Sequence, residues 1–329
     1  MKKTKRLLFI LLAAVFCASD ADASSSLFYF EAQGITGYSS HENRVQYHSG
    51  HKHDTMQKNG IGFDLVRRFS TEYGDFGVGA LQMRLVWDNN HNEPQVQFYN
   101  AYFRLKTSLA DIWIGHNRIS FGLASYWDTH AHLLQPLPMS GLGFEHDWGA
   151  GISRDFANGD FSAAVTTGSG MGIRTRGNRL ATARASFGVL ARDNYNIGVS
   201  FMGGKKLDTM GYEVMDDTPK NTLLGGVDFA YNHGRVEHRA DLVFGQKNEM
   251  AATAVFYRLG YNLMEDNRLK LEGQYVWTKL EGADANALGF GATYRIRYDL
   301  TARAMYQWER EMCDNRIVFQ LYYYRLLRR

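Results

Sequence analysis

Residues 269–278 read L-K-L-E-G-Q-Y-V-W-T, and this stretch decides the fold class. Apolar residues and one glycine alternate with a second set that is mostly polar. The first set is Leu269, Leu271, Gly273, Tyr275 and Trp277, and the second is Lys270, Glu272, Gln274, Val276 and Thr278. A period of two is that of a β-strand with one apolar and one polar face. The apolar face ends in aromatic residues, as lipid-facing strands do at a membrane interface, so the stretch predicts a membrane-facing strand.

The same alternation recurs along the whole chain, most clearly at residues 236–244 and 300–308. Marking every such segment predicts about 16 strands, at residues 26–38, 58–69, 75–88, 95–106, 110–122, 147–155, 160–168, 181–192, 195–204, 222–232, 235–246, 251–262, 267–279, 286–297, 299–309 and 314–326. Only a closed sheet satisfies every strand hydrogen bond in lipid. The fold class predicted is therefore all-β, a transmembrane antiparallel up-and-down β-barrel.

The connections between the predicted strands alternate in length. Short turns such as residues 157–160 and 232–234 carry hairpin residues. Between them fall longer polar loops near residues 39–57, 89–94, 123–146, 169–180 and 205–221, and shorter ones near 247–250, 280–285 and 310–313. This alternation is typical of periplasmic turns and extracellular loops. The four prolines, Pro94, Pro136, Pro138 and Pro219, all fall in or beside these loops, where a missing N–H does not break a strand ladder.

The N-terminus predicts export. Lys2, Lys3, Lys5 and Arg6 precede an apolar run over residues 7–18 and the small-residue triplet at 21–23, which is the pattern of a signal peptide cleaved after Ala23. The run is shorter than the roughly 20 residues of a membrane helix. Residues 1–23 are therefore the predicted signal peptide, and residues 24–329 are one outer-membrane β-barrel domain.

Charge and cysteine content exclude several function classes. The predicted mature chain has 33 basic and 32 acidic residues and no basic stripe, which gives no support for nucleic-acid binding. Cys17 lies in the signal peptide, where the bulky Phe16 before it argues against lipidation. Cys313 is then the one cysteine of the mature chain, so neither an intrachain disulfide nor a cysteine metal site is expected.

Residues 101–122, A-Y-F-R-L-K-T-S-L-A-D-I-W-I-G-H-N-R-I-S-F-G, resemble the strand-turn-strand stretch of the bacterial outer-membrane porin superfamily, of the general and phosphate-selective type. Gly115, Ile119, Phe121 and Gly122 match the family pattern, whereas His116 stands where an arginine is common. The resemblance covers about 22 residues closely. It implies a water-filled channel for passive diffusion of small polar solutes across the cell outer membrane, in contact with outer-membrane lipids, and a homotrimer.

Alternation also assigns candidate pore-lining residues. Those on the predicted polar faces are Arg84, Arg104, His116, Arg118, Arg184, Arg235, Glu237, Arg239, Asp241, Arg258, Lys270, Arg295, Arg297, Arg303 and Arg316. Fixed positive charge in a narrow pore attracts anions, so this excess predicts a preference for anionic solutes. The alternative is that mixed charges simply solvate a water-filled lumen.

The third long loop, near residues 123–146, is the longest. In the porin family the third extracellular loop folds into the lumen, so the resemblance makes Trp127, Asp128, His130 and His132 candidate constriction residues. An ordinary surface loop is the alternative.

Metal binding is a weak hypothesis. The first loop contains His41, His48, His51 and His53, and imidazole is a common metal ligand. Their spacing matches no fixed tetrahedral site, and histidines are ordinary in polar loops, so we expect no metal and no cofactor.

Two other functions stay open. One is a barrel scaffold that holds a partner protein in its lumen. The other is a barrel hydrolase, for which His48 with Ser49, or Asp128 with His130, would supply residue types but no third partner. We expect a channel and no enzyme.

Overall fold

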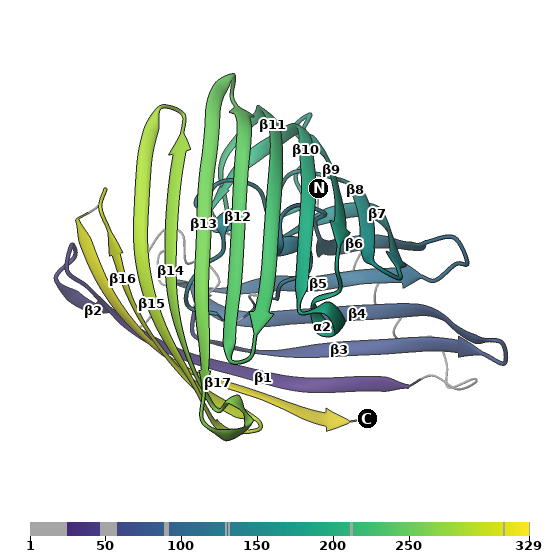
Figure 1. The fold of residues 1–329 in the computed structure, drawn as a ribbon, viewed down its shortest axis with the longest axis horizontal. Helices are drawn as coiled ribbons and strands as arrows, with labels where there is room; N and C mark the ends of the chain where they lie inside the picture. The colour runs from purple at the N-terminus through teal and green to yellow at the C-terminus, as the bar shows by residue number, and fades with distance from the viewer. Residues whose placement is uncertain are drawn as a thin grey trace.

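The computed structural model describes residues 25–46, 58–88, 92–128, 130, 132–210, 213–311 and 313–328. The predicted signal peptide, residues 1–23, lies outside the described residues. Among these residues 17 strands form one antiparallel sheet (Figure 1). The strands are β1 Ser26–Ser39, β2 Arg44–Gln46, β3 Gly60–Thr71, β4 Gly74–Asp88, β5 Glu93–Leu105, β6 Asp111–Arg118, β7 His146–Phe156, β8 Gly159–Thr166, β9 Arg179–Phe187, β10 Tyr195–Met210, β11 Glu213–His233, β12 Val236–Lys247, β13 Met250–Leu263, β14 Leu269–Leu280, β15 Ala283–Arg297, β16 Leu300–Glu309 and β17 Asp314–Arg328.

The sheet closes on itself as an up-and-down barrel. β1 pairs with β3 on one side and with β17 on the other, where the register runs from Phe28 opposite Arg328 to Ser39 opposite Arg316. The 16 strands other than β2 form the ring, and β2 only pairs with the end of β1. The predicted fold class and the predicted number of strands are confirmed. The few helical turns are α2 Leu190–Asp193 and the 3-10 turns η1 Leu123–Ser125, η2 Leu137–Ser140 and η3 Glu265–Asn267.

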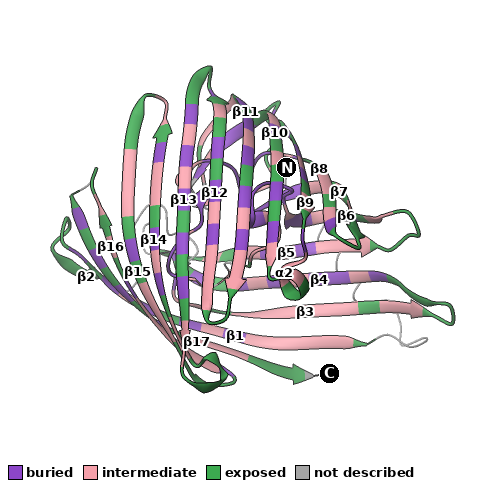
Figure 2. Cartoon of the chain, viewed as in Figure 1, coloured by how far each residue is buried: buried purple, intermediate pink, exposed green. Residues whose placement is uncertain are grey.

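The two faces of the strands alternate as the sequence predicts. In β14, Glu272, Gln274 and Thr278 are buried, whereas Leu271 and Tyr275 are exposed. The bands of buried and exposed residues along the strands in Figure 2 show this alternation around the ring. Buried polar residues face the lumen, because the core of this fold is inside the barrel. The exposed large side chains therefore lie on the outer surface.

That outer surface is apolar. Leu242, Phe244, Leu288, Phe290 and Phe319 are each at least about one third exposed, between 38% and 55%. A continuous apolar surface of this kind is the lipid-facing band of a transmembrane barrel. No helix in the described ranges is long and apolar enough to cross a membrane.

One predicted loop is wrong. Residues 205–221 are mostly strand, because β10 continues to Met210 and β11 begins at Glu213, so Pro219 lies within a strand. The pairing is irregular there, with register shifts between Lys206 and Asp208 and between Asp208 and Thr209. A proline that donates no N–H is tolerated at such a bulge. The residues of β11 near Pro219 are polar at successive positions, so alternation does not mark this part of the strand.

Two predicted strands end earlier than expected. β6 ends at Arg118 rather than at residue 122, and β9 ends at Phe187 rather than at residue 192. After β9, Gly188 has a φ of 87° and Asn194 a φ of 62°, and these left-handed residues bracket the short helix α2. After β6 the chain leaves the barrel wall and turns inward.

The inward turn leaves part of β5 without a neighbouring strand. Pairing between β5 and β6 ends at Ala101 opposite His116. Beyond this point the Phe98 N–H donates to Met171 Sδ at 2.9 Å, and the Trp148 indole N–H donates to the Met171 carbonyl at 2.7 Å. The loop between β8 and β9 thus supplies a partner for the exposed strand edge, which is otherwise a site of aberrant pairing.

Candidate functional site

The segment between β6 and β7, residues 119–145, is called the inward loop here. Its two ends pack on the inner wall through apolar residues. Ile119, Phe121, Leu123, Leu137, Leu142 and Phe144 form one buried cluster with Leu180, Met202, Leu224, Val243, Ala252, Ala254 and Phe256 of β9 to β13. These wall residues alternate with lipid-exposed ones, so they face inward. The inward loop therefore lies inside the barrel.

A second apolar cluster joins the inward loop to the other side of the barrel. Leu133 and Leu134 are buried against Ile35 of β1, Met305 of β16 and Val318 of β17. Leu134 also lies against the glycines of β15, where a Cβ added to Gly289 would be 2.5 Å from Leu134 Cδ2, and one added to Gly291 would be 3.1 Å from its Cδ1. The inward loop thus contacts both walls and narrows the lumen.

Two buried arginines hold the inward loop on the β9 to β14 wall. The Arg258 guanidinium donates to the Leu134 carbonyl at 2.8 Å and stacks over the Trp127 ring at 4.4 Å. Arg184 lies 4.5 Å from the centre of the Tyr126 ring and forms a two-point ion pair with Asp228 at 2.9 and 2.6 Å. Stacking of arginine on an aromatic ring is attractive, and more so where water is excluded.

Polar contacts hold the loop on the opposite wall. Glu31 of β1 pairs with Arg84 and accepts from the His130 ring at 3.0 Å. Asp128 pairs with Arg118 at 3.0 Å and accepts from the Tyr99 hydroxyl at 3.0 Å.

All four predicted constriction residues therefore contact the wall. Trp127 stacks with Arg258, Asp128 pairs with Arg118, and His130 contacts Glu31. The His132 ring lies 3.5 Å from Arg258.

The structure spreads the predicted pore-lining residues over three environments. Buried ones are Arg84, His116, Arg184, Arg239, Asp241, Arg258 and Arg316; half-buried ones are Arg104, Arg118, Glu237, Lys270 and Arg303; exposed ones are Arg235, Arg295 and Arg297. Arg235 lies in the turn between β11 and β12, and the other two lie at the end of β15. These three lie at the rim of the barrel rather than along its inner wall.

Sequence reasoning missed several of the carboxylates that neutralise these arginines. Glu31 pairs with Arg84, Asp160 contributes to Arg184, and Glu309 pairs with Arg316 at 2.8 Å. Alternation within β1 and β8 could have found Glu31 and Asp160, since both share the inward parity of their strands. The formal excess of basic residues is therefore largely compensated inside the barrel.

Arg303 differs from these arginines because its contacts are with neutral side chains. Its guanidinium donates to Gln320 Oε1 at 2.9 Å and lies 5.2 Å from the centre of the Tyr322 ring. Within the described ranges no carboxylate lies at ion-pair distance from it, nor from Arg104, which lies over the Tyr102 ring. Among the described residues, the partners of Arg303 that lie within hydrogen-bond or stacking distance are therefore neutral.

Burial keeps the two loop histidines neutral. Burial lowers the pKa of His132 to about 3, with Arg258 lowering it and Glu272 raising it. Burial, with the nearby Arg84, also lowers the pKa of His130, although Glu31 and Asp128 oppose this. The pKa of Asp128 is lowered, because Arg118 and His130 outweigh the effect of burial.

These shifts predict that docking of the inward loop weakens in acid. A folded-state pKa of about 3, against 6.5 for free histidine, means that the undocked loop binds more protons between these pH values. Docking stability is then complete above pH 6.5 and falls towards pH 3. Hydrogen exchange measured by mass spectrometry, corrected for intrinsic rates, should accelerate several-fold for residues 126–137 over this range. In His132→Gln the acceleration should shrink, and an unchanged pH profile would contradict the assignment.

Three of the four histidines of the metal hypothesis, His48, His51 and His53, lie outside the described residues. The His41 backbone N–H donates to Asp314 at 3.0 Å. Among the described residues no group of three or more His, Cys, Asp or Glu could hold a metal ion.

Comparison with known proteins identifies the fold. No protein-family model and no curated protein sequence matches the chain. Among solved structures, OmpT in its trimer form, an outer membrane protein of Vibrio cholerae, aligns with a TM-score of 0.66 at 10% identity, covering 92% of this chain and 100% of that one. Salmonella typhi OmpF in complex with daunomycin gives 0.66 at 12%, covering 91% and 97%. The anion-selective porin from Comamonas acidovorans gives 0.64 at 9%, covering 92% and 100%. The chain is thus a β-barrel with the fold of the bacterial outer-membrane porins.

Proposed function

We propose that this barrel is an outer-membrane channel for passive diffusion of small polar solutes. One observation carries the proposal: a closed 16-strand ring has a polar inner face and is narrowed, from both walls, by one inward loop. A charged and amide-rich lumen offers water and solutes the hydrogen bonds that the apolar outer face lacks. No step of such passage needs energy or a cofactor.

Reconstitution into planar lipid bilayers tests the proposal. Purified, folded protein should produce stepwise, ohmic conductance increments, and protein denatured by boiling should produce none. A barrel that inserts, as shown by protease protection, but never conducts would overturn the proposal.

The two alternative functions lose support from the same geometry. The inward loop occupies the space that a partner protein would need inside the barrel. Asp128 and His130, which a hydrolase would use, are bound to Arg118, Tyr99 and Glu31. A channel without catalytic activity agrees better with these contacts.

We also propose that the channel weakly prefers anions, and that Arg303 is the main source of this preference. Because most lumenal arginines are paired, the cations with neutral partners determine the sign of the selectivity. Arg303→Gln is expected to lower the anion-to-cation permeability ratio by about twofold. Reversal potentials in a salt gradient measure this ratio, and Arg154→Gln, which removes an exposed arginine of β7, should leave it unchanged. Cation selectivity in the unmodified protein would contradict the proposal.

We further propose a homotrimer. Support comes from the similar Vibrio cholerae barrel, whose structure is described as a trimer form. Light scattering of the detergent-solubilised protein should give three times the mass of one chain, and a monomer mass would contradict it.

A further inference from the structure

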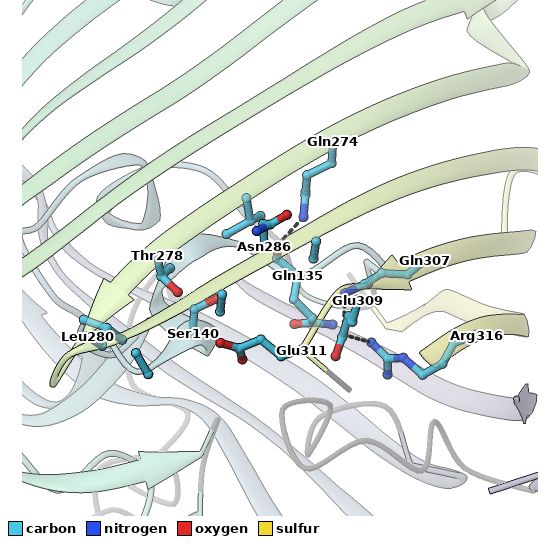
Figure 3. Close-up of a pocket in the computed structure, with 14 residues that line it drawn as sticks. Gln135, Ser140, Gln274, Thr278, Leu280, Asn286, Gln307, Glu309, Glu311 and Arg316 are labelled. Atoms are coloured by element: carbon cyan, nitrogen blue, oxygen red, sulfur yellow. Dashed lines mark hydrogen bonds and ion pairs between the residues drawn. The ribbon is translucent and has the colours of Figure 1, made fainter. Parts of the chain in front are cut away.

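A cavity of about 250 Å³ lies between the inward loop and the β14 to β17 wall (Figure 3). Gln135 and Ser140 line it from the loop side, whereas Gln274, Thr278 and Gln307 line it from the wall. Pockets that take drug-sized ligands measure roughly 300–1,000 Å³, so this one suits a solute about the size of one amino acid.

The inner face of β15 explains why space remains there. Its small residues follow one another at alternate positions, as Ala283, Ala285 and Ala287, and then Gly289 and Gly291. Leu134 fills the space beside the two glycines, but the cavity stays open beside the alanines. The apolar part of the cavity lining is formed by these alanines together with Val276 and Leu280 of β14.

Two amide side chains of the cavity use their N–H groups elsewhere and offer oxygens as acceptors. The Gln135 side-chain N–H groups donate to the carbonyls of His132 and Leu133 at 3.1 and 3.3 Å, which leaves the Gln135 amide oxygen available. Likewise the Gln307 amide N–H donates to Glu309 Oε1 at 2.7 Å, and the Gln307 amide oxygen stays available as an acceptor.

The net charge of the cavity is negative. Arg316 is the one cation among the described residues that line it, and Glu309 neutralises Arg316 at 2.8 Å. The Glu311 carboxylate points towards Ser140 in Figure 3, and within the described part of the chain it has no cationic partner. An unpaired carboxylate beside amide oxygens favours a charged hydrogen-bond donor.

Farther along the same wall the fixed charge is positive, so this section favours anions rather than cations. Arg303 lies on the inward face of β16, beyond Met305 and four residues from Gln307, which is about 13 Å in an extended strand. A solute with only a positive charge is disfavoured at Arg303, and one with only a negative charge is disfavoured at Glu311. A solute that carries both charges meets no net repulsion at either section.

We infer that this cavity is a subsite that recognises the ammonium group of a small zwitterionic solute with an apolar body, such as a single amino acid. The ammonium group donates to Glu311 and the amide oxygens, and the apolar body rests against Val276, Leu280 and the alanines of β15. The role of the subsite in transport rests on the proposed channel, whereas binding to it does not.

Ligand-observed NMR on the detergent-solubilised full chain tests binding with three probes of similar shape. L-leucine carries both charges, isopentylamine only the ammonium, and 4-methylpentanoate only the carboxylate. Leucine and isopentylamine should bind, and 4-methylpentanoate should not. Equal binding of the carboxylate probe would overturn the inference.

Matched variants locate the site. Glu311→Gln should weaken leucine binding by about five- to tenfold, the loss of one charge-assisted hydrogen bond. Glu249→Gln, the same change in the exposed β12–β13 turn, should have no effect. Ala285→Leu should fill the cavity and abolish binding, whereas Ala292→Leu on the outer face of the same strand should not. Leucine binding that is insensitive to Glu311→Gln would overturn the inference.

Bilayer recordings separate this inference from the proposed function. Binding that depends on Glu311 in a barrel without conductance would sustain the subsite and overturn the channel. A conducting barrel in which leucine does not bind would sustain the channel and overturn the subsite.

Discussion

Asp228→Ala is expected to lower the free energy of unfolding by about 3–5 kcal/mol, the usual cost of leaving a buried charge without its partner. The Arg184 side chain is 1% exposed and that of Asp228 is 0% exposed, and two hydrogen bonds join them at 2.6 and 2.9 Å. Arg184 also donates to Asn196 at 2.6 Å and stacks on Tyr126 of the inward loop. The substitution therefore leaves a buried guanidinium with only the longer contact to Asp160, at 3.4 Å, as its ion pair. Urea unfolding in phospholipid vesicles, followed by tryptophan fluorescence, measures the loss.

Two further variants separate this ion pair from the general effect of mutation. The double variant Arg184→Leu with Asp228→Leu should be more stable than Asp228→Ala, because no unpaired charge remains. Asp193→Ala breaks the more exposed pair with Arg192, at 2.8 Å, and the bond from the Val189 N–H, at 2.9 Å, and should cost far less stability than Asp228→Ala because water screens that pair. If Asp228→Ala behaves like Asp193→Ala, the pair contributes nothing and the assignment is wrong.

The barrel wall could be predicted from sequence because lipid and lumen impose opposite demands on neighbouring side chains. In β14, residues 269–280, every buried polar residue lies one position from an outward-facing one, so the period of two is visible in the sequence. The same rule fails where both faces meet one environment. Pro219 lies in a strand extension whose residues do not alternate between apolar and polar, so their pattern does not distinguish the extension from a loop.

The lumen was harder to predict, because its contacts join residues far apart in the chain. The position of the third loop indicated Trp127 and His130, but nothing local shows that Arg258 and Glu31 meet them. Apolar residues at inward positions, such as Met202 and Phe256, interrupt the polar face and mark where the loop docks. Glycines at alternate inward positions, Gly289 and Gly291, give a second signal, since glycine within a strand often marks close approach of another segment.

The largest functional effect is expected from releasing the tip of the inward loop. In the double variant Leu133→Ala with Leu134→Ala, single-channel conductance should rise at least about twofold, because apolar constrictions restrict hydrated ions. The two side chains are 5% and 3% exposed and fill the space between the loop and Ile35, Met305 and Val318. Truncation removes the apolar contact that holds the tip against β1, β16 and β17. Planar-bilayer recordings on the proposed channel measure the change.

The outward face supplies the control for this prediction. Leu242→Ala with Leu259→Ala removes the same number of atoms from lipid-exposed positions, which are 44% and 42% exposed, and should leave conductance unchanged. The Arg258 bond to the Leu134 carbonyl is a backbone contact and survives the double truncation, so the loop remains docked on the other wall. The single-channel conductance should therefore rise without the current fluctuations that a fully released loop would cause. An unchanged conductance in the Leu133 and Leu134 variant would mean that solutes pass elsewhere, on the side of the loop that faces Asp128 and Tyr99.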